Sequence, residues 1–540
     1  MLDLIIKNGR VADGTGNPLV YSDIGIKGDR IVQIGGVEAE AVRTIDARNM
    51  IVAPGFIDMH SHSDLRRFED PLDEIKLRQG VTTEVTGNCG FSPAPLTDRT
   101  ADLLKAYSKP ILGRLDRDWG WHGFGEYMDE LAKQKFSCSI VPCIGNGALR
   151  IAVKGFERGP LIKEEMDRIK RLLSEGLEAG AMGLSMGLMY APECYYRMEE
   201  LTEICTAAAR YGAVLTTHMR GEGATLVESV KEVIHIAESA GIPLNISHFK
   251  AAGVKNWGGV LDQAMEVIED GRSRGLDITC DVYPYTAGST SLPALLPPWS
   301  QEGGLGAAIG RLRDGKTKER IRADLLREHK DWDNPMLDAG WGRVCISMLN
   351  TGKNKPFIGK SLSEIAETSG KAPVDCALDL IAEENGNVTV ILHQMSDEDV
   401  KKVIAWKDSI IISDSLYPAG GNPHPRVYGT FPRLFRKYVR EDGVLTLEQA
   451  VKKVTFQPAR RFGIDGRGLL KLGFIADITI FDPGLIKDTA TYENPRQYPE
   501  GILYVITGGQ VAIEAGKHTG IRNGRVIRRG AQGGQKNGCL

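Results

Sequence analysis

Hydrophobic and polar residues alternate with a short period at both ends of the chain. Runs such as DLIIKNGRVAD near the N-terminus and GFIADITIFDP near the C-terminus alternate around Asn-Gly, Gly-Asp and Gly-Gly turns. This pattern predicts short strands joined by tight turns. We therefore predict one small β-sandwich domain built from residues 1–54 and 463–540, with a Gly-rich flexible tail at its C-terminal end.

Between these ends, apolar strand-like runs alternate with segments of helical period. Eight runs are candidate strands, among them IVAPGFIDMH, GAVLTTHMR and DSIIISDS, and patterns such as KEEMDRIKRLLSEGLEA lie between them. Strand–helix alternation predicts βα units and a parallel sheet. A closed (β/α)8 TIM barrel over residues 55–462 is the simplest account. Two more candidate strands, GRVCISMLN and NVTVILHQM, lie in an irregular stretch, which predicts an insertion around 290–405.

Metal-capable side chains stand at the ends of five candidate strands. In such a barrel the functional residues come from the carboxyl ends of the strands, and residues two apart in a strand point the same way. Taken singly, each has a structural explanation, such as a core cysteine or a hydrogen-bonded histidine. Their common placement favours a divalent metal site. The candidates are His60, His62, Cys89, His218, His248 and Asp414.

Composition narrows the class of protein. The 540 residues are 42% hydrophobic and 25% charged, which is enough material for a large core, and the net charge of −3 offers no field for nucleic acid or an anionic membrane. No apolar stretch long enough to span a membrane and no signal-peptide pattern is visible. The nine cysteines are scattered, which indicates a reducing compartment. We expect a soluble, cytoplasmic protein that binds a small molecule; the oligomeric state stays open.

Several segments of the chain resemble those of a known family. They include APGFIDMHSHSD, GVTTEVTGNCGFSPAP, GLSMGLMYAP, LTTHMRGEG, NISHFKAAG and HPRVYGTFPR. Over nearly its whole length the chain resembles the N-acyl-D-amino-acid deacylases, or D-aminoacylases, of the amidohydrolase superfamily. Many amidohydrolases place a carboxylated lysine on the fourth barrel strand. Here the fourth candidate, AGAMGLSMGL, has no lysine, and Cys89 is the natural substitute ligand.

The resemblance implies a metal arrangement and an activity. Cys89, His218 and His248 are expected to hold one tightly bound Zn2+. A second, weaker metal position is expected at His60 and His62, with Asp414 as a further candidate ligand. The activity implied is zinc-dependent hydrolysis of the amide bond of N-acyl-D-amino acids to a carboxylate and a free D-amino acid.

Further residues near the same strand ends are assigned to catalysis and to substrate. Asp414 would take a proton from the attacking water and give it to the leaving nitrogen. Lys250, Tyr283 and Arg426 together would make a clamp for the substrate α-carboxylate. Apolar residues between 290 and 340, as in SLPALLPPWS, favour an apolar or aromatic substrate side chain, although Arg311 and Arg313 lie in that stretch. Tyr190 and Ser289 are further candidates for the pocket.

Two other functions fit parts of the pattern. One is a different amidohydrolase activity, such as opening a cyclic amide of the hydantoin or dihydroorotate kind, or hydrolysing a dipeptide. The absence of the fourth-strand lysine and the presence of Cys89 weigh against cyclic amides. The other is an inactive barrel that serves as a binding protein. The intact set of ligands and Asp414 weighs against it.

Overall fold

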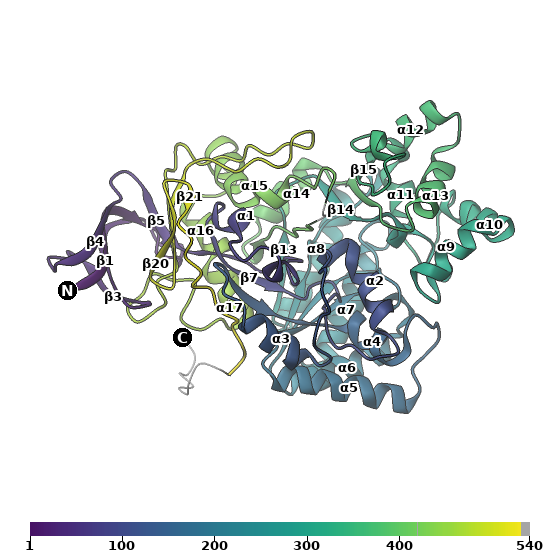
Figure 1. Cartoon of the computed structure of the whole chain (residues 1–540), viewed down its shortest axis with the longest axis horizontal. Coiled ribbons are helices and arrows are strands. Elements are labelled where there is room, and N and C mark those ends of the chain that lie inside the picture. Colours follow the sequence, from purple (N-terminus) through teal and green to yellow (C-terminus); the bar gives the residue numbers. More distant parts are fainter. Residues whose placement is uncertain (418–419, 531–540) are drawn as a thin grey trace.

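Both chain ends contribute strands to one sheet. The computed structural model describes residues 1–417 and 420–530, and the two ends meet in a nine-stranded sheet of order β21-β20-β19-β18-β5-β1-β2-β3, with β4 beside β1 (Figure 1). The junction is the antiparallel pair β5–β18. The strands of the two ends are hydrogen-bonded into one continuous sheet, and the sandwich arrangement stays a prediction. The predicted tail falls on residues 531–540, outside the described residues. The strands are β1 (Leu2–Val11), β2 (Val20–Lys27), β3 (Arg30–Gly35), β4 (Ala41–Asp46), β5 (Ile51–Pro54), β18 (Ile478–Phe481), β19 (Ile502–Thr507), β20 (Gln510–Glu514) and β21 (Lys517–His518).

A second group of strands pairs only in parallel. The pairings run β6–β7–β8 and β9–β10–β11–β12–β13–β17, and only Cys143 separates β8 from β9. A parallel bridge between Ser61 and Ser415 links the segment after β6 to the segment after β17. Parallel pairing brings the carboxyl ends of all these strands to one rim. The strands are β6 (Phe56–Asp58), β7 (Val81–Thr86), β8 (Ser139–Pro142), β9 (Ile144–Gly145), β10 (Gly183–Gly187), β11 (Val214–His218), β12 (Leu244–Ile246), β13 (Ile278–Val282) and β17 (Ser409–Ile411).

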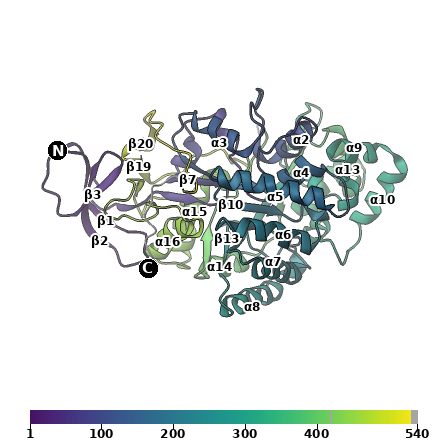
Figure 2. The ribbon, with the colours of Figure 1, turned by 90° about the horizontal axis from the view of Figure 1, so that it is seen from below.

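Amphipathic helices cover the outside of these parallel strands. In α5 (Lys163–Glu178) the buried residues Met166, Ile169, Leu173 and Leu177 recur every three or four positions, so one stripe of the helix faces the core. Helices α5 to α8 pack against one another in sequence order (Figure 2). The other helices around the strands are α1 (Glu74–Leu77), α2 (Ala101–Leu112), α3 (Phe124–Ala132), α4 (Asn146–Lys154), α6 (Met198–Ala209), α7 (Leu226–Ala240), α8 (Gly259–Ser273), α14 (Asp397–Ala405), α15 (Arg426–Arg433), α16 (Leu447–Val454) and α17 (Phe456–Phe462).

The irregular stretch before β17 is a folded unit of its own. Strands β14 (Ala287–Ser291), β15 (Val344–Met348) and β16 (Thr389–His393) form an antiparallel sheet of order β14-β16-β15. The unit has a separate hydrophobic cluster that includes Leu292 and Ile321. It lies on the side of the molecule away from the N-terminal strands (Figure 1). Its helices are α9 (Leu305–Arg313), α10 (Gly315–Leu325), α11 (Pro335–Ala339), α12 (Leu362–Ser369) and α13 (Pro373–Glu383).

Two further observations concern membrane-spanning helices and the state of the cysteines. Within the described residues, no helix has the length and the apolar character that crossing a membrane requires. All eight cysteines in the described part of the chain are free thiols. Cys89 is therefore available as a ligand.

Candidate metal centre and active site

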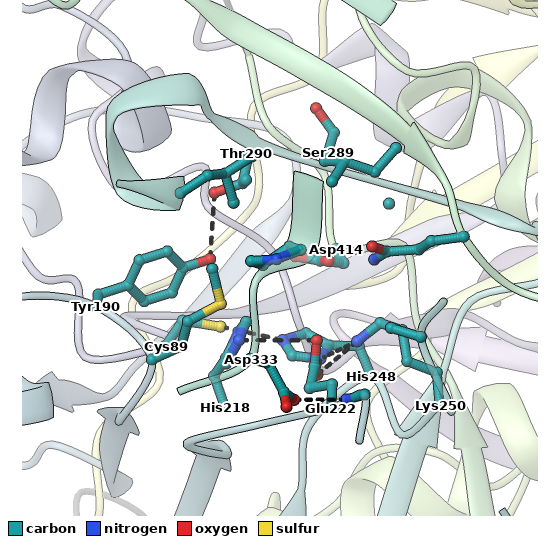
Figure 3. Close-up of a pocket in the computed structure, with 18 of the residues that line it drawn as sticks. Cys89, Tyr190, His218, Glu222, His248, Lys250, Ser289, Thr290, Asp333 and Asp414 are labelled. Atoms are coloured by element: carbon teal, nitrogen blue, oxygen red, sulfur yellow. Dashed lines mark hydrogen bonds and ion pairs between the residues drawn. The ribbon is translucent and has the colours of Figure 1, made fainter. Parts of the chain in front are cut away.

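The six predicted metal-capable residues meet at the rim of the parallel strands. His218 is the last residue of β11, and the others lie two to four residues beyond the ends of β6, β7, β12 and β17. All six side chains are buried, although they come from segments up to about 350 residues apart in the chain. Figure 3 shows Cys89, His218, His248 and Asp414 around one cavity.

The donor atoms of these residues are close enough to share metal ions. Cys89 Sγ lies 3.3 Å from His60 Nε2 and 3.5 Å from His248 Nε2. Asp414 Oδ1 lies 3.4 Å from His60 Nε2 and 3.3 Å from His62 Nε2. The donors of His60, Cys89 and His248, and those of His60, His62 and Asp414, form two groups with every pair within 4.8 Å. The two groups share His60.

Unusual backbone conformations aim three of these side chains. Cys89, His248 and Asp414 have φ values of 52°, 36° and 49°. Residues other than glycine rarely adopt this left-handed region, and holding one there costs on the order of 1–3 kcal/mol. The residue after Cys89 must be glycine for the loop to pack as it does, because a Cβ at Gly90 would overlap the Glu193 carboxylate. The folded structure therefore maintains local strain at the positions where the donors are presented.

Glu222 joins the site although the sequence did not suggest it. Its carboxylate lies 2.8 Å from His248 Nδ1, 3.8 Å from His218 Nε2 and 2.5 Å from Lys250 Nζ. With His218 and His248 it makes a third group of donors within 4.8 Å. The available signal was its position four residues after His218, in HMRGEG.

Asp281 is a second residue that sequence reasoning missed. It is fully buried at the end of β13, and its carboxylate accepts the backbone N–H of His248 at 2.5 Å and the side-chain amide of Asn245 at 2.7 Å. Its other contact is with His60 Nδ1, at 3.6 Å. A carboxylate behind a metal-binding histidine orients the ring. The signal in the sequence was its position two residues before Tyr283, on the same face of the strand.

The electrostatics of the site favour the ionised forms of the Cys89 and Asp414 side chains. Burial raises the pKa of the Cys89 thiol, but the nearby imidazoles, His60 first and then His218 and His248, outweigh it and lower the pKa well below its usual value. Burial likewise raises the pKa of Asp414, but Arg426 and then His60 lower it well below its usual range. A thiolate and a carboxylate thus lie together in a buried space. Such a space is stabilised by a cation.

Unpaired nitrogen atoms indicate where that cation belongs. Within the described residues, both ring nitrogens of His218 are buried without a hydrogen-bond partner, and its ring lies 4.4 Å from that of His248. Buried polar atoms are normally satisfied. Thiolate and imidazole together are a ligand set that suits zinc. The residues present therefore fit a metal centre.

The cavity beside the metal-capable residues contains four of the five predicted substrate residues. Lys250, Tyr283, Tyr190 and Ser289 all line it, within about 850 Å³ of space that includes its opening to solvent. The Tyr190 hydroxyl lies 3.3 Å from Thr290 Oγ1, at the side of the cavity formed by β14 (Figure 3).

Arg426, the fifth predicted substrate residue, lies directly behind Asp414. Arg426 does not line the cavity; its guanidinium is buried, lies 2.9 Å from the Asp414 carboxylate and stacks over the Tyr283 ring at 4.5 Å. Within the described residues its Nε and both Nη atoms are buried without a hydrogen-bond partner. Its place in the predicted carboxylate clamp stays a prediction.

Among the described residues, the inserted unit contributes no cationic side chain to the lining of the cavity. Arg311 donates to backbone carbonyls of Ser300 and Glu302, Arg313 donates to Asn385, and neither lines the cavity. The lining from this unit includes the apolar Leu295 and Leu392 and the acidic Asp333 and Asp338.

Comparisons with known proteins agree with this geometry. Residues 43–513 match the signature of the Amidohydrolase family. The chain is 34% identical to a D-aminoacylase of Alcaligenes xylosoxydans xylosoxydans, over 98% of each chain, and 34% identical to an N-acyl-D-glutamate deacylase of the same organism, over 98% of this chain and 97% of that one. Its structure is similar to that of an N-acyl-D-glutamate deacylase from Bordetella bronchiseptica in complex with zinc and a phosphonate inhibitor that mimics the tetrahedral intermediate. That similarity has a TM-score of 0.83 and 30% identity, covering 98% of this chain and 99% of that one.

Proposed function

Because this chain belongs to the amidohydrolase family, we propose that it hydrolyses the amide bond of N-acyl-D-amino acids to a carboxylate and a free D-amino acid. The observation that carries the proposal is the meeting of Cys89, four histidines and Asp414 at one rim, beside a cavity that holds a lysine and a tyrosine. An N-acyl-D-glutamate deacylase of similar structure has been crystallised with zinc and a mimic of a tetrahedral intermediate. Tetrahedral intermediates are typical of amide hydrolysis.

We assign the metal to zinc. Cys89, His218 and His248 would hold the tight ion, and His60, His62 and Asp414 would make the second, weaker position. A related D-aminoacylase is described as having a binuclear centre in which one metal activates and the second attenuates. When bound, zinc supplies Lewis acidity toward the amide carbonyl and toward water.

Asp414 is the proton carrier in this proposal. Its carboxylate is ionised, because Arg426 and His60 offset the effect of burial. It lines the cavity and lies against both histidines of the second group, so it can accept a proton from an attacking water. The same oxygen can then return that proton to the leaving nitrogen. Arg426 is a positioning residue that holds Asp414 and keeps it charged.

Lys250, Tyr283 and Ser289 are the proposed site for the α-carboxylate. With Nε2 of His248 turned toward the metal position, its Nδ1–H donates to Glu222. Lys250 donates to the same carboxylate, and its Nζ also lies 2.9 Å from His248 Nδ1. Of its three N–H groups, at least one is left for a ligand in the cavity. The Tyr283 hydroxyl and the Ser289 hydroxyl supply further donors on the lining.

The side-chain end of the cavity favours neutral substrates. The nearest guanidinium on the lining, that of Arg220, already binds Glu232 and the carbonyls of Cys194 and Tyr196. Asp333 and Asp338 would repel an acidic side chain. We therefore propose an apolar D-amino acid, such as D-leucine, as a better substrate than D-glutamate or D-aspartate.

The fold belongs to the same proposal. We interpret the circuit of parallel strands and outer helices as a closed (β/α)8 TIM barrel over residues 55–462, with β8 and β9 as one interrupted strand. Residues 1–54 and 463–530 would form the separate terminal domain. A cytoplasmic location, suggested by the scattered cysteines, stays a prediction.

Turnover of paired substrates tests the activity. The zinc-loaded protein should hydrolyse N-acetyl-D-leucine with a kcat/KM at least about tenfold above that for N-acetyl-L-leucine. The metal position, the α-carboxylate site and the side-chain wall each hold one part of the substrate, and only one enantiomer fits all three. N-acetyl-D-glutamate should be the poorer D-substrate. Hydantoin and dihydroorotate serve as cyclic amides and alanyl-D-leucine as a dipeptide. Faster turnover of any of these three, or equal rates on both enantiomers, would overturn the proposal.

A further inference from the structure

A second cavity adjoins the catalytic one. It is enclosed by α2, by Phe156 and by the start of the inserted unit at residues 291–308. Phe91, Ile111 and Tyr190 line both cavities, so the wall between them is one side chain thick. The empty space amounts to about 740 Å³, including its opening to solvent.

The walls of this second cavity are apolar. None of its lining residues carries a charge, and most are alkyl or aromatic, such as Leu103, Phe156 and Leu305. The side-chain amide of Gln301 is engaged with the carbonyl of Leu296. A charged or strongly polar ligand would lose its hydration there without compensation. The chemistry of the lining therefore suits a hydrocarbon chain.

The shared wall lies beside the reacting groups and apart from the polar anchors. The Phe91 ring is 6.2 Å from the His62 ring and 5.2 Å from the Tyr190 ring, and it stacks on Tyr107 of the second cavity at 4.5 Å. Lys250 and Tyr283, the proposed anchors of the α-carboxylate, line only the catalytic cavity. Tyr190 and Lys250 are drawn on opposite sides of His248 in Figure 3.

A substrate amide placed between these groups has two ends to accommodate. The amino-acid end carries the carboxylate and belongs beside Lys250. The acyl end carries no charge and leaves the scissile carbon in another direction, toward the wall of Phe91 and Tyr190. Apolar space lies directly behind that wall, and a chain longer than acetyl that passes between these side chains would enter it.

We propose that the second cavity binds the alkyl chain of the acyl group, so that N-acyl-D-amino acids with chains longer than acetyl are the better substrates. The inference rests on the proposed deacylase function and adds the substrate class to it. Each methylene that moves from water into the cavity strengthens binding by up to about fourfold. Between acetyl and octanoyl, six methylenes are added, and we expect at least a tenfold rise in kcat/KM.

The test compares acyl lengths with the amino acid unchanged. N-acetyl-, N-butanoyl- and N-octanoyl-D-leucine are assayed with the zinc-loaded enzyme and with two filling variants. Ala106→Phe places a ring at the exposed edge of the second cavity, and Ala294→Phe places one in its half-buried wall. Both alanines line the second cavity and not the first. Each variant should lower the octanoyl-to-acetyl ratio of kcat/KM at least tenfold. Lys109→Phe, an exposed position on the same helix that lines neither cavity, is the matched control and should leave the ratio within about twofold.

The outcomes separate the two proposals. Hydrolysis of N-acetyl-D-leucine with no gain for octanoyl, or a ratio unaffected by both filling variants, overturns the acyl-chain inference alone. Failure to hydrolyse any of the three compounds overturns the deacylase function and this inference with it. The inhibition constants of octanoate and acetate give a second readout, and octanoate should bind at least tenfold more tightly than acetate. Melting temperatures confirm that each variant is folded. If only one of the two filling variants folds, that variant alone is sufficient for the test.

Discussion

Replacing Arg426 by methionine removes the guanidinium that lies 2.9 Å from the Asp414 carboxylate and keeps much of the side-chain volume. Both groups are buried, so water cannot take the place of the lost charge. Opposite charges about 4 Å apart attract by about 4 kcal/mol at an effective dielectric constant of about 20. If half of that energy holds Asp414 in its working position, the loss of about 2 kcal/mol lowers kcat about 30-fold.

The assay uses two substrates that differ only at the α-carboxylate. N-acetyl-D-leucine carries it, and N-acetyl-D-leucinamide replaces it by a neutral amide. Because Arg426 contacts Asp414 and does not line the cavity, Arg426→Met should lower kcat by the same factor on both substrates and change KM little. Lys250→Met should instead raise KM for the carboxylate substrate alone.

Arg426→Lys is the matched control, because it keeps a positive charge near Asp414 and should recover part of kcat. Zinc content and melting temperature show whether the variants are folded and loaded. A loss confined to N-acetyl-D-leucine would refute the reasoning. It would mean that Arg426 binds the substrate carboxylate, as the sequence had predicted, and that its burial behind Asp414 gives way on binding.

Three further predictions concern the metal, the proton carrier and pH. Cys89→Ala should lose the tight zinc on dialysis, measured by metal analysis, whereas His62→Ala should keep it; full zinc content in Cys89→Ala would contradict the ligand assignment. Asp414→Asn should retain that zinc yet lose roughly 10²–10⁴-fold in kcat, and near-normal turnover would exclude its role. Burial raises the pKa of Glu193 from 4.5 to about 8, so the stability associated with its protonated form is full below 4.5 and is lost as pH rises to about 8. Glu193→Gln should therefore flatten the fall in melting temperature over that range in calorimetry, and an unchanged slope would count against it.

In the inserted unit, hydrophobic patterns predicted strands but did not predict a polar helix. The sequence predicted two strands in an irregular stretch, and both exist as β15 and β16. Helix α10 was missed because its sequence, GKTKERIRADL, is strongly polar and buries only Ile321, Asp324 and Leu325. Such a helix is stabilised by packing within its own unit and has little apolar periodicity to detect.

The metal-capable residues could be found from the sequence because the evidence for them is local. A period of two residues places His60 and His62 on the same side, and parallel strands bring their carboxyl ends together. Glu222 and Asp281 escaped because nothing local distinguishes a carboxylate that supports a ligand from one that is solvated. Their roles depend on His248, which lies 26 residues from one and 33 from the other.

By itself, the sequence determined the kinds of donor, the strands that carry them and the chemistry they support, because side-chain type and strand direction follow from short segments. Only the tertiary structure decided which charges are neighbours. Arg426 follows Asp414 by twelve residues, and helix α15 turns its guanidinium back onto that carboxylate. The second cavity likewise exists only where α2 packs beside β14, on segments nearly 180 residues apart. Electrostatic pairing and cavity shape depend on distances through space, and a linear pattern does not contain those distances until the chain has folded.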